Sequence, residues 1–531
     1  MGRLYSRLEL TGDPTEMNGA TSLLQTLINN GVEVCFTNPG TSEMHMVAAI
    51  GQTVGMRSML CLFEGVCTGA ADGYGRMAGK PACTLLHLGP GLSNGSANLH
   101  NARKANSPVI NLIGDHATYH KQYDAPLTSD IITLAQPVSH WVRSVKDAAS
   151  LPSDAADAVV AANRKPGCVS TLIVPADCAW DESVAPVARR ELPEPPRADA
   201  AAIKRTAELL KNGKPSLLLM GNMALTENAL ALADQVAQAT GARIFCDTFV
   251  TRVARGEGRC NIERLGYFAE QATEQINGIE QLIMVGTKAP VAFFAYPGKP
   301  SEFYPPGSTL HVLADVEQDA EAALAGLVAE LGADGLAPRR LAAGKPAVMQ
   351  GELSPRSLAA SFAARLPTDA IVVDEGATGG GGCYPASTAA EPHDWLCLTG
   401  GSIGYGLPTA VGCAAACPDR KVVCIHGDGG AMYTIQALWT MARENLDICV
   451  VILANRKYQI LQVELARVGA QSMNKKTLDM LDIGNPDLDF VQLAQGMGVT
   501  AARADTAEGF DKLLEAAMAE PGPRLIEALI P

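Results

Sequence analysis

The chain has 531 residues and a formal net charge of −14, with no run of basic residues, which argues against a nucleic-acid partner. None of its 14 cysteines forms a C-x-x-C pair, so neither a disulfide framework nor a zinc site is indicated. No charge-free run of about 18 apolar residues could span a membrane, and no signal peptide is evident at the start. We expect a cytoplasmic protein of about three domains, preceded by an extension over residues 1–16.

The first predicted domain, over about 17–180, places a carboxylate directly after a buried strand. The apolar run 59–63 predicts a strand, and Glu64 follows it at the start of a helix of small residues. A carboxylate there is costly unless it is paired or protonated, and glutamate is a poor N-cap residue. We therefore interpret Glu64 as a candidate acid–base group, with helix capping as the structural alternative.

Further polar groups of this domain follow other predicted strands. The strand 32–37 leads into Asn38-Pro39-Gly40-Thr41-Ser42-Glu43, a turn that ends in a capping arrangement. The strand 82–86 leads into His87, and the strand 109–113 into Gly114-Asp115-His116, with His120 soon after. Titratable groups at strand ends are candidate site residues. His87 either caps a turn or takes part in chemistry, whereas we expect His120 at the surface.

The middle domain is predicted over about 200–335, after a linker at 183–199 rich in Pro, Arg and Glu. Apolar runs predict strands that alternate with amphipathic helices, at 216–220, 242–246, 281–285 and 309–314. This pattern is typical of a doubly wound α/β domain. The segment 286–290 lacks the G-x-G-x-x-G spacing of a dinucleotide site, so FAD is not indicated and a nicotinamide dehydrogenase is disfavoured. We expect this domain to be structural and to narrow the path of the substrate.

The last domain, over about 353–531, follows an Ala/Gly/Pro-rich linker at 335–351. It contains a strand at 421–425, the turn Gly427-Asp428-Gly429-Gly430, a helix at 432–444 and a strand at 448–454 that ends before Asn455. This βαβ order predicts parallel strands whose carboxyl ends share one edge of the sheet.

Asp428 and Asn455 would then lie together at that edge. A carboxylate and an amide oxygen suit a hard cation such as Mg²⁺, and the amides of Gly429 and Gly430 at a helix start favour a phosphate. The pair predicts a Mg²⁺–diphosphate site, although a lone Gly-Asp-Gly could be a plain turn. The spacing, 455 − 428 = 27 positions, resembles the signature of the thiamine diphosphate-dependent enzymes.

The resemblance covers about 17–531 and is to the benzoylformate decarboxylases and acetohydroxyacid (acetolactate) synthases. It implies an α/β fold of three doubly wound parallel-sheet domains, which are the pyrimidine-binding, middle and diphosphate-binding domains. It also implies thiamine diphosphate and Mg²⁺ as cofactors, a 2-oxo acid substrate and, for a carboligase, an aldehyde or 2-oxo acid acceptor. In this family Glu64 of one subunit would meet Asp428 and Asn455 of another, in a homodimer or homotetramer.

The resemblance also implies roles for residues at matching positions. Around the metal and the diphosphate these residues are the Lys457 carbonyl as a third metal ligand, Tyr458, Thr378 and Gly379. Around the thiamine pyrimidine they are Asn38, Pro39, Glu64, the Gly401 carbonyl and Ile403, which wedges between the two rings unless it is an ordinary core residue. His87 would relay protons, and His116 is a further catalytic candidate.

The sequence departs from both branches of the family. Asp115-His116 stands where the synthases carry Gly-Gln, and Ala295 stands where benzoylformate decarboxylases place a second histidine. The segment 459–464 is closer to the synthases, whereas 427–440 is very like the decarboxylases. Decarboxylation and carboligation therefore stay open. A cofactor-binding regulatory or assembly subunit is the alternative, and the combination of Glu64, Asp428 and Asn455 argues against it.

Overall fold

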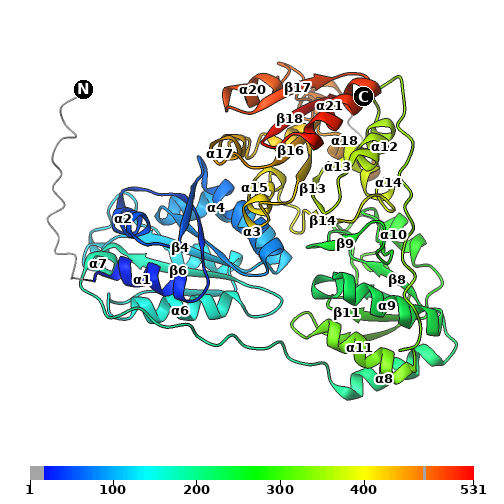
Figure 1. Cartoon of the computed structure of the whole chain (residues 1–531), viewed down its shortest axis with the longest axis horizontal. Coiled ribbons are helices and arrows are strands. Elements are labelled where there is room, and N and C mark those ends of the chain that lie inside the picture. The colour runs from blue at the N-terminus through cyan, green and yellow to red at the C-terminus, as the bar shows by residue number, and fades with distance from the viewer. Residues whose placement is uncertain (1–16, 470–473) are drawn as a thin grey trace.

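Three sheets, each dominated by parallel strands, organise the chain in the computed structural model, which describes residues 17–469 and 474–531. The expected extension over 1–16 lies outside the described residues. In Figure 1 the N-terminal sheet and its helices lie to the left, the middle sheet at the lower right and the C-terminal sheet above both. The predicted α/β class with three doubly wound sheets is confirmed.

The N-terminal sheet has six strands, all parallel. In sheet order they are β2 (Arg57–Leu60), β1 (Val34–Asn38), β3 (Ala82–Leu86), β4 (Val109–Asp115), β6 (Val169–Pro175) and β5 (Trp141–Ser144). The main helices around it are α1 (Gly19–Asn29), α2 (Met44–Gln52), α3 (Glu64–Ala78), α4 (Leu88–Ala105) and α6 (Leu151–Ala162). The strand order reverses between β1 and β3, and ligands bind at such switch points.

The middle sheet has five parallel strands. They are β10 (Glu263–Arg264), β8 (Arg243–Cys246), β7 (Ser216–Met220), β11 (Gln281–Val285) and β12 (Thr309–Ala314). The helices α8 (Ala200–Lys211), α9 (Glu227–Thr240), α10 (Ala269–Gln275) and α11 (Ala320–Leu331) accompany these strands.

The C-terminal sheet has seven strands. They are β17 (Thr500–Ala504), β18 (Arg524–Leu529), β16 (Ile448–Ala454), β15 (Val422–Gly427), β13 (Ala370–Glu375), β14 (His393–Cys397) and β9 (Val253–Arg255). The first six are parallel, whereas β9, from the middle of the chain, pairs antiparallel with β14. The order reverses between β13 and β15, so Glu375 and Asp428 lie at this second switch point.

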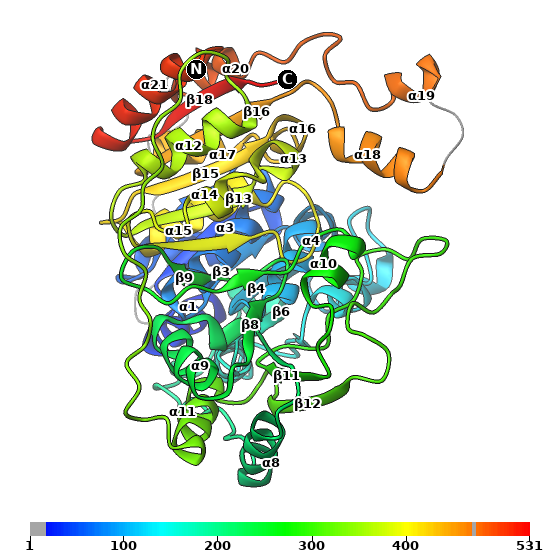
Figure 2. The same cartoon turned by 90° about the vertical axis from the view of Figure 1, so that its right-hand side faces the viewer.

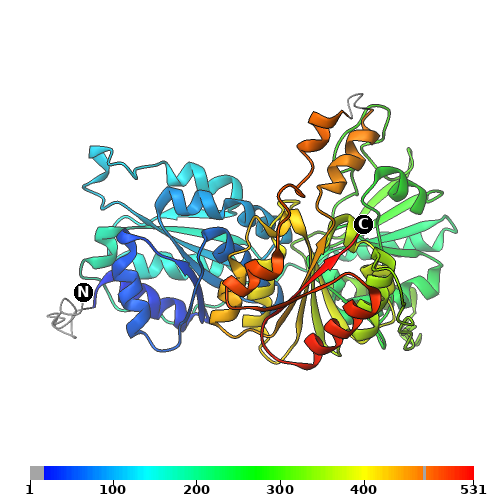
Figure 3. The same cartoon turned by 90° about the horizontal axis from the view of Figure 1, so that it is seen from above.

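Several helices belong to the C-terminal part of the chain. They are α12 (Pro355–Arg365), α13 (Ala377–Gly380), α14 (Cys383–Ala386), α15 (Gly406–Ala416), α16 (Asp428–Ala431), α17 (Ala437–Arg443), α18 (Gln459–Arg467), α19 (Lys475–Asp479), α20 (Phe490–Gly496) and α21 (Ala507–Ala519). Figures 2 and 3 show α18 and α19 projecting away from the sheet. The continuous helix predicted over 432–444 is wrong, because the chain turns between α16 and α17 and Thr434 donates a hydrogen bond to the Gly404 carbonyl at 2.8 Å.

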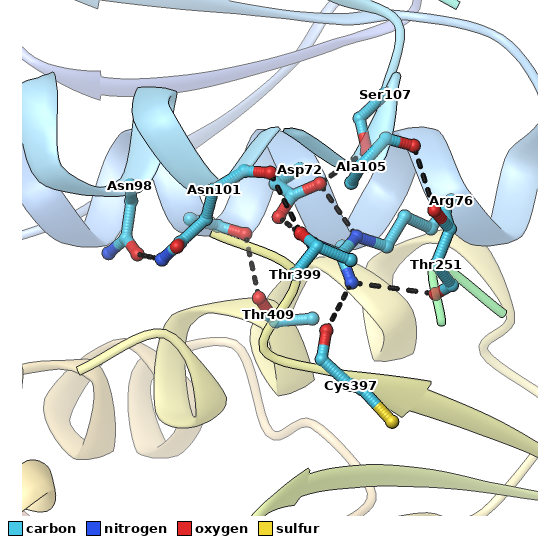
Figure 4. A network of polar contacts seen from close by, with 12 residues as sticks. Asp72, Arg76, Asn98, Asn101, Ala105, Ser107, Thr251, Cys397, Thr399 and Thr409 are labelled. Carbon is cyan, nitrogen blue, oxygen red and sulfur yellow. Dashed lines mark hydrogen bonds and ion pairs between the residues drawn. The ribbon is translucent and has the colours of Figure 1, made fainter. Parts of the chain in front are cut away.

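The N-terminal and C-terminal sheets are joined through α3 and α15. These helices cross closely, since a Cβ on Gly412 would lie 1.9 Å from the carbonyl oxygen of Ala70. Beside the crossing, the buried Arg76 forms a bidentate ion pair with Asp72, at 2.7 and 2.8 Å, and donates to the Cys397 carbonyl at 2.8 Å (Figure 4). The cost of burying this guanidinium is offset by that pairing, which fixes how the two sheets sit together. No helix in the described part of the chain is long and apolar enough to cross a membrane.

Candidate active site

The predicted metal ligands Asp428 and Asn455 lie at neighbouring strand ends. Their strands β15 and β16 pair in parallel, as the βαβ pattern predicts. Asp428 accepts hydrogen bonds from the amides of Arg456 at 2.6 Å and Gly429 at 2.8 Å. Burial raises the pKa of Asp428, although these amides act in the opposite direction. The amide oxygen of Asn455 accepts from the Lys457 amide at 3.2 Å.

This donor set fits a magnesium ion and not a softer metal. It would consist of one carboxylate, one amide oxygen and the Lys457 carbonyl, which are the hard oxygen ligands that Mg²⁺ takes together with water and phosphate. No group of three or more His, Cys, Asp or Glu side chains able to hold a metal is found within 17–469 and 474–531. The helix dipole at Gly429 and Gly430 contributes less to phosphate binding than predicted, because α16 has only four residues.

Gln459 is a site residue that the motifs did not single out for a contact. Its Oε1 accepts from Asn455 Nδ2 at 3.0 Å and from Thr378 Oγ1 at 3.2 Å. It thereby joins the glycine-rich turn after β13 to the metal-ligand turn after β16 and directs the Asn455 oxygen away from itself. Thr378 is exposed and Gly379 is buried beneath it. The Tyr458 ring packs against Gly429, where a Cβ would come within 2.4 Å of the ring.

Glu375 and His426 form a buried pair below these turns, and sequence reasoning missed both as site residues. Glu375 accepts hydrogen bonds from the amides of Gly404 and Gly406, each at 2.6 Å. His426 Nε2 lies 3.0 Å from Glu375 Oε2, close enough for an ion pair, but the geometry is not that of a directed hydrogen bond. Burial alone would lower the pKa of His426, but the Glu375 carboxylate outweighs it and raises this pKa. The pair ties the predicted pyrimidine turn to the strand that precedes Asp428.

The predicted pyrimidine turn around Gly401 and Ile403 is held from the N-terminal domain of the same chain. On α4, His100 contacts the Gly400 carbonyl at 3.0 Å, and Asn101 donates to the Ser402 carbonyl at 2.8 Å. Ile403 is 38% exposed, so it is not the ordinary core residue of the alternative interpretation.

The backbone that follows Glu64 lies beside this turn within the same chain. Asn98 Nδ2 donates to the carbonyl of Gly65, which follows Glu64, at 2.9 Å and to that of Gly404 at 3.3 Å. Glu64 begins α3, makes no side-chain cap and, among the described residues, accepts one hydrogen bond, from Asn94 Nδ2 at 3.0 Å. The capping alternative is therefore wrong, and a buried carboxylate with one donor retains capacity for another partner.

His87, Asn38 and Pro39 lie at the switch point of the N-terminal sheet. Asn38 pairs in register with Leu86, the residue before His87, and both Asn38 and Pro39 are half-buried. His87 makes no side-chain cap to α4, so the turn-capping alternative is wrong here too. Instead its Nδ1 lies 2.9 Å from Glu43 Oε2.

His116 is less well placed than His87. It follows Asp115, which pairs with Lys121 at 2.5 Å and accepts from the His116 amide at 2.8 Å. The His116 Nε2 is buried with no hydrogen-bond partner in the described part of the chain, and its ring centroid lies 5.5 Å from that of His120, with the two ring planes tilted by 53°. His120 is exposed, as expected.

Aromatic side chains of the middle domain cover the pyrimidine turn. A Cβ on Gly401 would lie 3.3 Å from the ring of Phe293, which packs on Phe249 at 5.1 Å and on Tyr267 at 5.4 Å. The exposed Ala295 belongs to the same loop.

This architecture defines a class of α/β protein with polar groups gathered at two sheet switch points. Residues 17–136 match the thiamine pyrophosphate enzyme N-terminal TPP binding domain, and residues 380–528 match the C-terminal TPP binding domain. The chain belongs to the thiamine pyrophosphate enzymes, in the family of acetolactate synthases and benzoylformate decarboxylases.

Three relatives illustrate both branches. A Mycobacterium tuberculosis protein named as a candidate acetolactate synthase large subunit, IlvX, is 51% identical over 97% of this chain and 99% of its own length. A benzoylformate decarboxylase of Pseudomonas aeruginosa is 29% identical, over 94% of this chain and 96% of its own length. The solved thiamine diphosphate-dependent 4-hydroxybenzoylformate decarboxylase of Rhodococcus jostii is 25% identical with a TM-score of 0.83, over 97% of this chain and 99% of that one.

Proposed function

We propose that the protein uses thiamine diphosphate and Mg²⁺ to decarboxylate a 2-oxo acid. The observation that carries the proposal is the meeting of Asp428 and Asn455 at the neighbouring ends of β15 and β16, where backbone amides hold both side chains. Bound thiamine diphosphate would supply the carbon nucleophile and accept the electron pair that carbon dioxide leaves behind.

The residues of this chain would divide the remaining work. Asp428, Asn455 and the Lys457 carbonyl would hold Mg²⁺, with Thr378, Gly379 and Tyr458 at the diphosphate. Glu64 would hold and release the proton at a pyrimidine nitrogen, while Gly401 and Ile403 would orient the ring. Because Asn38, Pro39 and His87 lie at the strand ends nearest to Glu64, we place the substrate carboxylate and carbonyl beside them.

The fate of the product carbon depends on whether a proton or a second carbonyl meets it. The His87–Glu43 contact at 2.9 Å supports a proton-transferring role for His87, which favours protonation of the product carbon and release of an aldehyde. Carboligation is the second candidate, and the 51% identity to the M. tuberculosis relative favours it.

We also infer a dimer or tetramer in the cytoplasm, with Glu64 of one subunit facing Asp428 and Asn455 of another. Exposed apolar side chains support this inference, because Ile403, Tyr433 and Leu461 are 38%, 54% and 46% exposed in a single chain. Light scattering of the purified protein tests it, and a monomer with full activity would contradict it.

The reaction is tested with protein loaded with thiamine diphosphate and Mg²⁺. It is incubated with a panel of 2-oxo acids, with and without acceptor aldehydes, while carbon dioxide and products are followed by mass spectrometry. We expect carbon dioxide release that requires both cofactors, and an aldehyde product identifies a decarboxylase. A product with a new carbon–carbon bond identifies a carboligase. No release from any 2-oxo acid would favour the alternative of a regulatory or assembly subunit.

A further inference from the structure

Glu43 is a buried carboxylate for which the proposed site assigns no role. Its side chain is fully buried, and His87 is its one ion-pair partner among the described residues. Sequence reasoning interprets Glu43 as a capping residue, and its Oε2 does accept from the Gly40 amide at 2.8 Å. A cap needs only that contact and would normally stay in water, so capping leaves the complete burial of Glu43 unexplained.

The other contacts of Glu43 hold one histidine. Its Oε2 lies 2.9 Å from Nδ1 of His87, and Ser42 Oγ donates to its Oε1 at 2.6 Å. The backbone makes room for this pair, because a Cβ on Gly114 would lie 1.7 Å from Glu43 Oε1 and a Cβ on Gly40 would lie 2.1 Å from His87 Nδ1. Gly40, in the turn after β1, and Gly114, near the end of β4, thus leave room for the Glu43 carboxylate and the His87 imidazole at hydrogen-bond distance.

The pair has a buried end and an open end. The Glu43 side chain is 0% exposed, whereas that of His87 is 20% exposed. No hydrogen bond from the described residues reaches His87 Nε2, so this nitrogen is available on the open side. A carboxylate that accepts from Nδ1–H fixes the tautomer of an imidazole and leaves Nε2 to exchange a proton.

We propose that Glu43 is a positioning residue, which holds His87 in the Nδ1–H tautomer so that Nε2 delivers the proton to the product carbon. This inference rests on the proposed decarboxylation. The imidazolium gives its Nε2 proton to the carbon that has lost carbon dioxide and becomes the neutral Nδ1–H form. Water then returns a proton to Nε2. Glu43 takes up no proton in this step, and Glu64, the other carboxylate near His87, would serve the cofactor.

The test is a double-mutant cycle of Glu43→Gln, His87→Ala and the double variant, all loaded with thiamine diphosphate and Mg²⁺. We expect Glu43→Gln to lower kcat by about 10- to 100-fold, the usual effect of losing a group that orients a catalytic side chain. KM and cofactor affinity should change less than about twofold, because Glu43 touches neither ligand in this proposal. In the His87→Ala background the same change should alter kcat by less than about twofold.

A purely structural role gives a different result. Glu43→Gln would then lower kcat by the same factor in both backgrounds, and either this outcome or an unchanged kcat overturns the proposal. Glu33→Gln is the matched control, because Glu33 is a surface carboxylate paired with Lys80. If Glu43→Gln does not fold, Ser42→Ala removes one donor to Glu43 and also the 3.3 Å contact of the Ser42 hydroxyl with His87 Nδ1. This variant should lower kcat severalfold only when His87 is present.

A second measurement does not depend on the reaction. In protein labelled with ¹⁵N at Nδ1 of its nine histidines, the solid-state NMR signal lost in His87→Ala belongs to His87. We expect a protonated Nδ1 in the parent and the loss of this preference in Glu43→Leu, whose side chain accepts no hydrogen bond, and an unprotonated Nδ1 in the parent overturns the proposal. If the parent has the expected tautomer but releases no carbon dioxide, the proposed function fails while the positioning by Glu43 stands.

Discussion

Two histidines occupy equivalent places in the N-terminal and C-terminal sheets, yet their surroundings give them different properties. His87 follows β3 and His426 lies near the end of β15, each next to a switch point and before a glycine-rich turn. Each lies about as far from a glutamate, at 2.9 Å from Glu43 and 3.0 Å from Glu375. His87 is partly open, whereas His426 is fully buried and its other nitrogen lies 3.0 Å from the Gly427 carbonyl.

The difference teaches that the exposure of the histidine, and not its pairing with a glutamate, decides whether it can transfer a proton or only stabilises the structure around it. An imidazole with one free nitrogen can exchange a proton, while one enclosed on all sides can only hold neighbouring backbone in place. The N-terminal cluster therefore contains groups suited to proton transfer, and the C-terminal cluster contains groups suited to holding a cofactor. Substitutions in the two clusters should fail in different ways.

The largest effect is expected for Glu64→Gln in the N-terminal cluster. We expect kcat to fall by about 100- to 10,000-fold, the range for losing a group that transfers a proton. The amide oxygen of glutamine can still accept from Asn94, so thermal unfolding should stay close to that of the parent. Steady-state kinetics with the best 2-oxo acid measures the loss, with Glu33→Gln as the control. Full activity in Glu64→Gln would remove the proposed acid–base role.

His426→Ala should instead lower stability. It leaves the Glu375 carboxylate buried without its charged partner, and breaking such a pair typically costs about 3–5 kcal/mol. The amides of Gly404 and Gly406 still satisfy part of that carboxylate, which places the expected loss at the lower end. Denaturant unfolding of the two alanine variants, His426→Ala and His87→Ala, makes the comparison. Equal losses would show that exposure does not separate the two histidines.

How much of the site could be predicted from the sequence depends on where a residue's partner lies. A partner within the same βαβ unit is predictable, whereas one on a strand that becomes a neighbour only in the folded sheet is not. Asp428 and Asn455 are separated by one βαβ unit, so their meeting follows from the pattern of strands. Glu375 and His426 meet because β13 and β15 are neighbours in the sheet, although β14 separates these strands in the chain. A glutamate at the end of one predicted strand and a histidine at the end of another were the available signals.

Other features depended on packing that no local pattern contains. The antiparallel strand β9 joins the last sheet from the middle of the chain, and the break after α16 follows from a hydrogen bond between Thr434 and the Gly404 carbonyl. Glu43 has the sequence pattern of a cap, and only the absence of side chains at Gly40, in the turn after β1, and at Gly114, in β4, leaves room for His87 beside it.

Asp428→Ala should weaken the binding of the cofactor and leave proton transfer intact. Removing the one carboxylate of the predicted magnesium site should reduce thiamine diphosphate affinity at least about tenfold at fixed Mg²⁺, by analogy with losses at metal sites. Calorimetric titration measures this affinity, and saturating cofactor should restore part of kcat, unlike in Glu64→Gln. Asp505→Ala, at an exposed carboxylate, is the control. An unchanged affinity would mean that the metal site is elsewhere.

The smallest effect concerns a third histidine, which has no carboxylate partner among residues 17–469 and 474–531. His393 begins β14, is 0% exposed and pairs in register with Arg255 of β9. Burial and, to a smaller extent, the Arg255 guanidinium lower the pKa of His393 to about 4. The folded protein therefore keeps His393 neutral while the unfolded chain takes up a proton below about pH 6.5. The stability associated with His393 is complete above that pH and is lost as pH falls toward 4. Between pH 7.5 and 5.5 the loss should be on the order of 1 kcal/mol.

In His393→Asn the side chain can still donate to the Glu391 carbonyl, as Nδ1 does at 2.7 Å, but cannot titrate. Denaturant unfolding at both pH values should therefore show a smaller decrease for the variant than for the parent. An identical decrease would mean that His393 becomes charged in the folded state. A neighbouring carboxylate would then not be what distinguishes a buried histidine with a raised pKa, such as His426, from one that stays neutral.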